Sequence, residues 1–210
     1  MPTIPPDMLL AFDTSSAACT AALFDETGAC VATRDELIGR GHAERLVPMI
    51  ADLMDGHRAE QILVGVGPGS FTGIRVAIAA AQGLAIGWDA ELAGISSLAL
   101  LAASTSGDGP VVAVVSGGHG ELFFQDFDGS TLKALSVICS LSPEQAASRT
   151  SAPLAVGSGA AALIAARGWG EAREAWPAAS QALRLPPELR RLTPKPIYAR
   201  APDARVPAAA

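Results

Sequence analysis

One pattern of short segments occurs twice in this chain of 210 residues, and it limits the possible folds more than any other feature. Leu9 to Asp13 is an apolar run that ends in a turn of small residues, and Ala21 to Asp25 is a second apolar run closed by an acidic turn. The segments from Val111 to Val115 and from Leu122 to Phe127 repeat that order about one hundred residues later. A repeat of this length indicates two related lobes rather than a solenoid of short units.

The order of elements within each repeat predicts the fold class. Three short apolar runs up to Leu37 indicate an antiparallel meander, and helical spacing begins at Ala43. A strand at Ile62 to Val66, a helix after Gly73 and a strand at Glu91 to Ile95 follow. A meander followed by alternating helices and strands, given twice, predicts an α/β fold. The two lobes are ribonuclease-H-like, in the arrangement of actin, sugar kinases and Hsp70.

The Gly- and Ser-rich stretch from Ser104 to Pro110 is the predicted domain boundary. Residues 1–105 are expected to form an N-terminal lobe with interface helices, and residues 106–210 a smaller C-terminal lobe. In the second lobe we expect a segment at 131–138, a helix from Pro143, a strand at 154–156 and a helix at 160–167. The chain is rich in proline after Trp176, and we expect this tail to wrap the surface.

The composition restricts the classes of partner. The net charge of −6 argues against direct nucleic-acid binding by this chain, because neutralising phosphates requires clustered Lys and Arg. Only 17% of residues are charged, against about 25% in an average soluble protein, so we expect apolar surface to face a partner. Three separate cysteines predict no disulfide framework and fit a reducing cytoplasm. The N-terminus does not resemble a signal peptide, and we expect no membrane span.

The turn after the first strand is the candidate nucleotide site. Asp13, Thr14 and Ser15 stand where proteins of the actin type place an acid and small hydroxyl residues beside phosphate and metal. The alternative is an Asx-type turn that joins two strands. The corresponding position in the second lobe, near Ser116, lacks an acid, so both interpretations stay open.

The segment GVGPGSFTGIR, from Gly65 to Arg75, is a second candidate for close contact with a ligand. It is neither a Walker loop nor a Rossmann fingerprint, because no Lys follows its last glycine and its glycine spacing is one residue too long. A phosphate at the following helix is one interpretation, and a plain N-cap at Ser70 or Thr72 is the other. Arg75 could pair with an acid or lie in solvent.

No catalytic or metal site can be assembled from the sequence, since His42, His57 and His119 lack partners at ligand spacing. The two apolar helices instead suggest contact with a partner or a second copy. The alternative is that the two lobes cover these helices within one molecule. The predicted interface residues are His42, Leu46, Val47, Met49, Ile50, Leu53, Phe71, Thr72, Ile74, Arg75, Ala77, Ile78 and Ala81.

Three motifs together carry a family resemblance. LLAFDTS from Leu9, GHAERLVPMI from Gly41 and GPGSFTGIR from Gly67 resemble the TsaB/YeaZ family, and the closing PIYARAP from Pro196 is similar to that family's C-terminal segment. The resemblance implies an actin-like fold and a role in making N6-threonylcarbamoyladenosine beside the anticodon of tRNAs that read codons beginning with A. It also implies a cytoplasmic scaffold without catalytic residues of its own.

The resemblance further implies the partners. The scaffold would pair with TsaD, the catalytic subunit, and the ATPase TsaE would join them; alone, the same face would form a homodimer. ATP or ADP and metal are then expected on the partner subunits, and tRNA would be contacted only through the complex. The second lobe departs from the family pattern at Ser116 to Phe123. An independent ATPase or peptidase of the actin-like fold is the alternative function.

Overall fold

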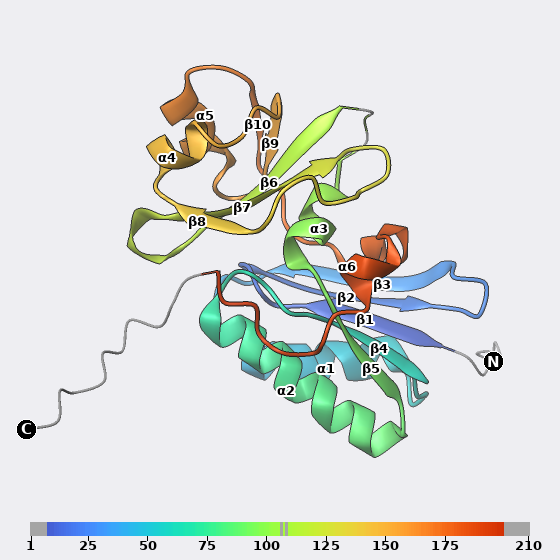
Figure 1. Ribbon diagram of the computed structural model, residues 1–210. Helices are drawn as coiled ribbons and strands as arrows, with labels where there is room; N and C mark the ends of the chain where they lie inside the picture. The colour runs from blue at the N-terminus through green and yellow to red at the C-terminus, as the bar shows by residue number, and fades with distance from the viewer. Residues whose placement is uncertain (1–7, 106, 108, 200–210) are drawn as a thin grey trace, which may run out of the picture.

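The computed structural model describes residues 8–105, 107 and 109–199, and these form two lobes, each built on one five-stranded sheet (Figure 1). Residues 1–7 and the Arg200-Ala201-Pro202 end of the family-like segment lie outside the described residues. The first lobe contains β1 (Leu9–Asp13), β2 (Ala18–Phe24), β3 (Cys30–Leu37), α1 (His42–Met54), β4 (Gln61–Gly65), α2 (Phe71–Trp88), β5 (Glu91–Ile95) and α3 (Ser97–Ala102).

The second lobe and the end of the chain contain the remaining elements. They are β6 (Pro110–Ser116), η1 (Gly118–Gly120), β7 (Leu122–Asp128), β8 (Cys139–Leu141), α4 (Pro143–Ala147), β9 (Leu154–Val156), α5 (Ala160–Arg167), β10 (Glu171–Arg173), η2 (Ala179–Arg184) and α6 (Pro187–Arg190). Residues 131–138 form a loop with one isolated bridge rather than a regular element. The next strand, β8, begins just after the segment expected from the sequence.

The two sheets have the same topology, which confirms the predicted fold. The strand order is β3-β2-β1-β4-β5 in the first lobe and β8-β7-β6-β9-β10 in the second. In each sheet the first three strands are antiparallel, and the fourth and fifth strands run parallel to the first. The sequence repeat is therefore a structural duplication of the ribonuclease-H-like lobe.

Alternation along the strands sends side chains to two different cores. Leu10 and Phe12 of β1 face the core beneath α1 and α2, whereas Ala11 faces the core between the lobes. Val112 and Val114 of β6 face α4 and α5, whereas Ala113 faces the same interlobe core. One continuous apolar cluster thus joins the two sheets, with α3 lying between them (Figure 1).

The end of the chain is part of this interlobe core. Ala179, Ala182 and Leu185 are buried in it, and η2 packs against β1 and β2. The prediction of a tail that wraps the surface after Trp176 is therefore wrong for η2, because small residues there fill the space between the sheets. Farther on, Leu192 pairs with Gly94 of β5 and the Ile197 N–H donates to the Val66 carbonyl at 2.8 Å. The chain so returns from the second lobe to the first.

Candidate functional site

The glycines of the turn before α2 allow close packing against protein backbone. A Cβ at Gly69 would lie 2.1 Å from the Ser15 carbonyl oxygen, and a Cβ at Gly73 would lie 1.9 Å from the Thr14 carbonyl oxygen. The Ser70 N–H donates to the Ser15 carbonyl at 2.6 Å. The space that a phosphate would need on this side of the turn is filled by the turn after β1.

Ser70 is the N-cap of α2, as one of the two sequence interpretations predicted. Its hydroxyl oxygen accepts from the Gly73 N–H at 3.2 Å. The Thr14 hydroxyl donates to the Gly73 carbonyl at 2.7 Å. Together with the Ser70 to Ser15 hydrogen bond, this contact joins the start of α2 to the turn after β1.

The parallel order of β1, β4 and β5 brings their carboxyl ends to one edge of the sheet, and Asp13 lies there fully buried. One carboxylate oxygen accepts from the Ser15 N–H and hydroxyl at 2.7 Å each, and the other accepts from the Ser97 hydroxyl at 2.5 Å. Burial raises the pKa of this carboxyl, against the opposing effect of these hydrogen bonds. The Asx-type turn is therefore what the geometry supports.

These residues do not fit a nucleotide with its metal. Both oxygens of Asp13 are engaged inside the protein, and Thr14 is buried with its hydroxyl bonded to Gly73. Within residues 8–105, 107 and 109–199, no three His, Cys, Asp or Glu side chains gather as metal ligands would. Ser97, the partner that sequence reasoning missed, lies 84 residues from Asp13, and no local pattern marks it.

The structure corrects most of the predicted interface. Nine of the thirteen residues are buried against the first sheet or between the helices and it: His42, Leu46, Met49, Ile50, Leu53, Ile74, Ala77, Ile78 and Ala81. They form the stripe that covers one face of the sheet, because an apolar sheet face must be packed against another element. For these nine, the alternative of cover within one molecule is the correct one.

His42, the first residue of α1, is buried close enough to Asp13 to interact with it electrostatically. Its Nε2 has no hydrogen-bond partner in the described part of the chain. The other four predicted residues are exposed: Val47, Phe71, Thr72 and Arg75. Val47 lies on the outer side of α1, and the remaining three lie in the first two turns of α2.

The outer face of α2 is apolar as well as exposed. The exposed or half-exposed residues of α2 are Phe71, Thr72, Arg75, Val76, Ala79, Ala80, Gln82, Gly83, Leu84, Ala85, Ile86, Gly87 and Trp88. By length and composition this helix could cross a membrane, although the sequence led us to expect no such span. Five of its 18 residues, or 28%, are buried, as in a helix that packs one side on a sheet.

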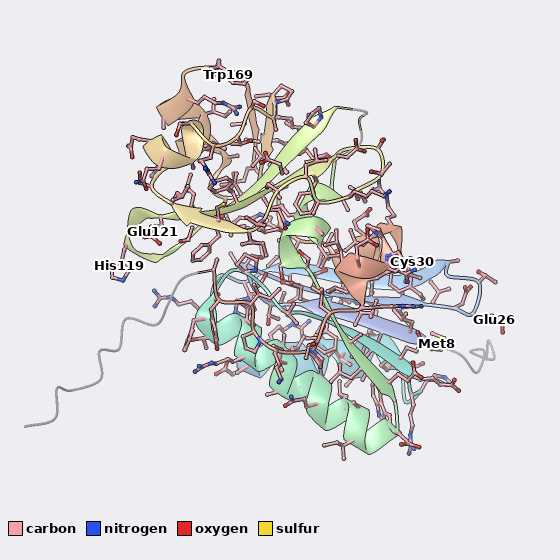
Figure 2. The ribbon with its side chains drawn as sticks, in the orientation of Figure 1. Met8, Glu26, Cys30, His119, Glu121 and Trp169 are labelled. Atoms are coloured by element: carbon pink, nitrogen blue, oxygen red, sulfur yellow. The ribbon has the colours of Figure 1, made fainter. Side chains whose placement is uncertain are left out.

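A cleft of about 890 Å³ opens between the lobes, on the other side of the turn before α2. Its lining includes Ser15, Phe71 and Arg75 of the first lobe and the β6–β7 loop of the second. Figure 2 labels His119 and Glu121 on that loop, which points toward the first lobe. Among the described residues Arg75 pairs with no acid; its Nε donates to the Tyr198 hydroxyl at 3.1 Å. Tyr198 is a second contact that the sequence reasoning missed.

Comparisons with known proteins agree with this architecture. The family model described as "TsaD: tRNA N6-adenosine threonylcarbamoyltransferase" matches residues 33–152, more than half of the chain. The structure named "YeaZ from Pseudomonas aeruginosa" superposes with a TM-score of 0.75 at 30% identity, over 92% of this chain and 100% of that one. The chain belongs to the TsaB/YeaZ family. A second Pseudomonas aeruginosa structure, described as similar to peptidase YEAZ, has a TM-score of 0.79 at 29% identity over 93% of this chain and all of its own.

Curated TsaB proteins are similar to about half of the chain. "tRNA threonylcarbamoyladenosine biosynthesis protein TsaB" of Escherichia coli is 33% identical over 127 residues, which is 57% of this chain and 54% of that protein. The protein of the same name from Haemophilus influenzae is 39% identical over 102 residues, which is 45% of this chain and 41% of that one. The matched region thus spans about half the length of these TsaB relatives.

Proposed function

We propose that this chain is a non-catalytic scaffold subunit in the N6-threonylcarbamoylation of the adenosine beside the anticodon, in tRNAs that read codons beginning with A. It pairs with a TsaD-class catalytic subunit through the outer face of α1 and α2. Membership of the TsaB/YeaZ family and the printed function of its curated relatives support this role. The match of the TsaD model to residues 33–152 relates this chain itself to the family of the proposed partner.

The observation that carries the proposal is the outer face of the helix pair. Along α2, Ala79, Gly83 and Ile86 are exposed, and Arg75 is the one charged residue between Phe71 and Trp88. Small side chains such as Ala and Gly let a second helix approach closely. A contiguous exposed apolar face is typical of an interaction site on a folded protein. On α1, which packs beside α2, Val47 is 51% exposed.

The same face accounts for the proposed partners. TsaD occupies it in the working complex, a second copy of this chain occupies it when TsaD is absent, and TsaE joins the pair. In this proposal ATP or ADP and metal are bound by those partner subunits, and the engaged carboxylate of Asp13 is consistent with that division. The net charge of −6 leaves tRNA contacts to the complex, and the cytoplasm is the compartment where these components meet.

Two matched substitutions test the proposal. Val47→Glu places a charge on the proposed face, and Val31→Glu places the same charge on β3, where the exposed fraction is 52% against 51% for Val47. An unpaired charge buried in an apolar interface costs about 3–5 kcal/mol, so Val47→Glu should abolish pairing with TsaD, whereas Val31→Glu should leave it intact.

The readouts are co-elution with TsaD and the yield of modified tRNA with TsaD, TsaE and the acyl donor supplied. Full modification without this chain, or equal pairing by the two variants, would reject the proposal. Leu46→Glu and Ala77→Glu are unsuitable variants, because both side chains are fully buried and the charge would unfold the lobe.

A further inference from the structure

The cleft between the lobes has a lining that differs in charge from the rest of the chain. The chain carries 21 Asp and Glu residues, yet none of the described residues that line the cleft is acidic. Arg75 is the only Lys or Arg among those lining residues. Five serines from both lobes also line the cleft: Ser15, Ser16, Ser70, Ser116 and Ser158. A cleft with one guanidinium and no carboxylate favours an anion over a cation.

Arg75 is held in place by two aromatic rings. Its guanidinium carbon lies 3.7 Å from the centre of the Phe71 ring and 6.0 Å from that of the Tyr198 ring. Its Nε donates to the Tyr198 hydroxyl at 3.1 Å, and the two rings lie 5.6 Å apart. The backbone next to Tyr198 is anchored to the first lobe, because the Ile197 N–H donates to the Val66 carbonyl.

This arrangement leaves the two terminal nitrogens of Arg75 without an acceptor among the described residues. A guanidinium whose plane is already fixed presents those N–H groups as a fork, and such a fork matches the two oxygens of a carboxylate or a phosphate. Less side-chain freedom is then lost when an anion binds.

Flat apolar walls complete the cleft. Phe71, Phe123, Trp176 and Tyr198 all line it, which is four of the ten aromatic residues in the chain. Aromatic rings stack with other planar ring systems, and a cavity of about 890 Å³ is within the range of small-ligand sites.

We propose that this cleft binds a small organic anion that carries a planar ring, with its carboxylate or phosphate on Arg75 and its ring between the aromatic walls. The ligand binds without a metal ion, which distinguishes this site from the nucleotide-metal site at Asp13 that the residues do not fit. The proposal concerns the chain without TsaD. Arg75 also lies in the first two turns of α2, on the helix whose outer face is proposed to meet TsaD, so the titrations are made in the absence of TsaD.

The test uses Trp176 as a reporter inside the cleft. The variant Trp88→Phe/Trp169→Phe keeps Trp176 as its only tryptophan, since the chain has three. It is titrated in EDTA with two ring-bearing anions, AMP for the phosphate and 1-naphthoate for the carboxylate, and with their uncharged counterparts adenosine and 1-naphthamide. We expect saturable quenching by at least one anion and at least tenfold weaker binding of its neutral counterpart, and the arm that binds identifies the anionic group.

Substitutions in that background locate the anchor. Arg75→Gln should weaken anion binding at least tenfold and leave adenosine and naphthamide unchanged. Tyr198→Phe keeps the ring and removes the hydroxyl that orients Arg75, so we expect a smaller loss. Arg34→Gln on β3 removes an exposed arginine that is not among the residues lining the cleft, and it should have no effect. Absence of saturable quenching by both anions, equal binding of the neutral counterparts, or unchanged binding in Arg75→Gln with an unaltered melting temperature would each overturn the proposal.

Discussion

Asp13 and Ser97 connect three turns at one edge of the first sheet. The Gly67 N–H donates to the Ser97 hydroxyl oxygen at 3.0 Å, and the Ser97 hydroxyl donates to Asp13. Ser97→Ala therefore leaves a buried carboxylate oxygen and a buried N–H without partners, which should lower the free energy of unfolding by about 1–3 kcal/mol. Ser104→Ala removes a hydroxyl at an exposed position, where it donates to the Leu101 carbonyl, and should cost less than about 0.5 kcal/mol. Urea denaturation of both variants measures the difference, and equal losses would contradict the structural role of Ser97.

The buried carboxyl of Asp13 also predicts a pH dependence. Because burial raises its pKa above the ordinary value of 3.8, the folded state holds this proton at a pH where the unfolded state has released it. The Asp13 contribution to stability is therefore largest below pH 3.8 and declines as the pH rises through the folded-state pKa. Asp13→Asn removes this titration, so its stability relative to wild type should increase as the pH is raised from about 4 toward 7. Denaturation at several pH values checks the slope, and a constant difference between the two proteins would contradict it.

At the scale of an element, two of the three glycines of α2 have opposite surroundings. A Cβ at Gly73 would lie 1.9 Å from the Thr14 carbonyl oxygen, whereas a Cβ at Gly83 would meet nothing within 4 Å. Alanine is favoured over glycine in a helix by about 1 kcal/mol, so Gly83→Ala should raise the free energy of unfolding by up to that amount. Gly73→Ala should lower it by about 1–3 kcal/mol, because the turn after β1 must move. Melting temperatures of the isolated chain distinguish them, and a stabilising Gly73→Ala would show that the two segments do not pack as described.

The sequence predicts features that depend on neighbouring residues better than features that depend on residues far apart in the chain. The repeated strands and most of the helices have clear periods, and they were placed within a residue or two, whereas β10 consists of three exposed residues and gives no apolar signal. Periodicity identifies the apolar faces of α1 and α2 but does not say whether the same chain or a partner covers them. The predicted interface therefore included nine residues that are buried within this chain. The contacts that position the site join residues 84 and 123 positions apart, and no local pattern encodes such pairs.

At the scale of the whole molecule, one apolar cluster crosses both lobes. It includes Ala11 and Ile95 of the first sheet, Ala113 of the second, Leu98 of α3 between them and Ala182 of η2. Two lobes that share a core, with the end of the chain packed into it, should unfold as one cooperative unit. We expect no separate transition for residues 1–105 or for the rest.

Two single-tryptophan variants test this cooperativity. Trp88 lies on α2 of the first lobe, and Trp169 lies at the end of the second lobe farthest from the first (Figure 2). Guanidinium unfolding followed through each tryptophan alone should give coincident midpoints. Leu98→Ala, at a fully buried position in the shared core, should lower both midpoints equally, with a loss of about 2–5 kcal/mol. If the Trp169 transition stayed in place while the Trp88 transition moved, the lobes would be energetically independent, and the interlobe cluster would be a contact between two domains rather than a common core.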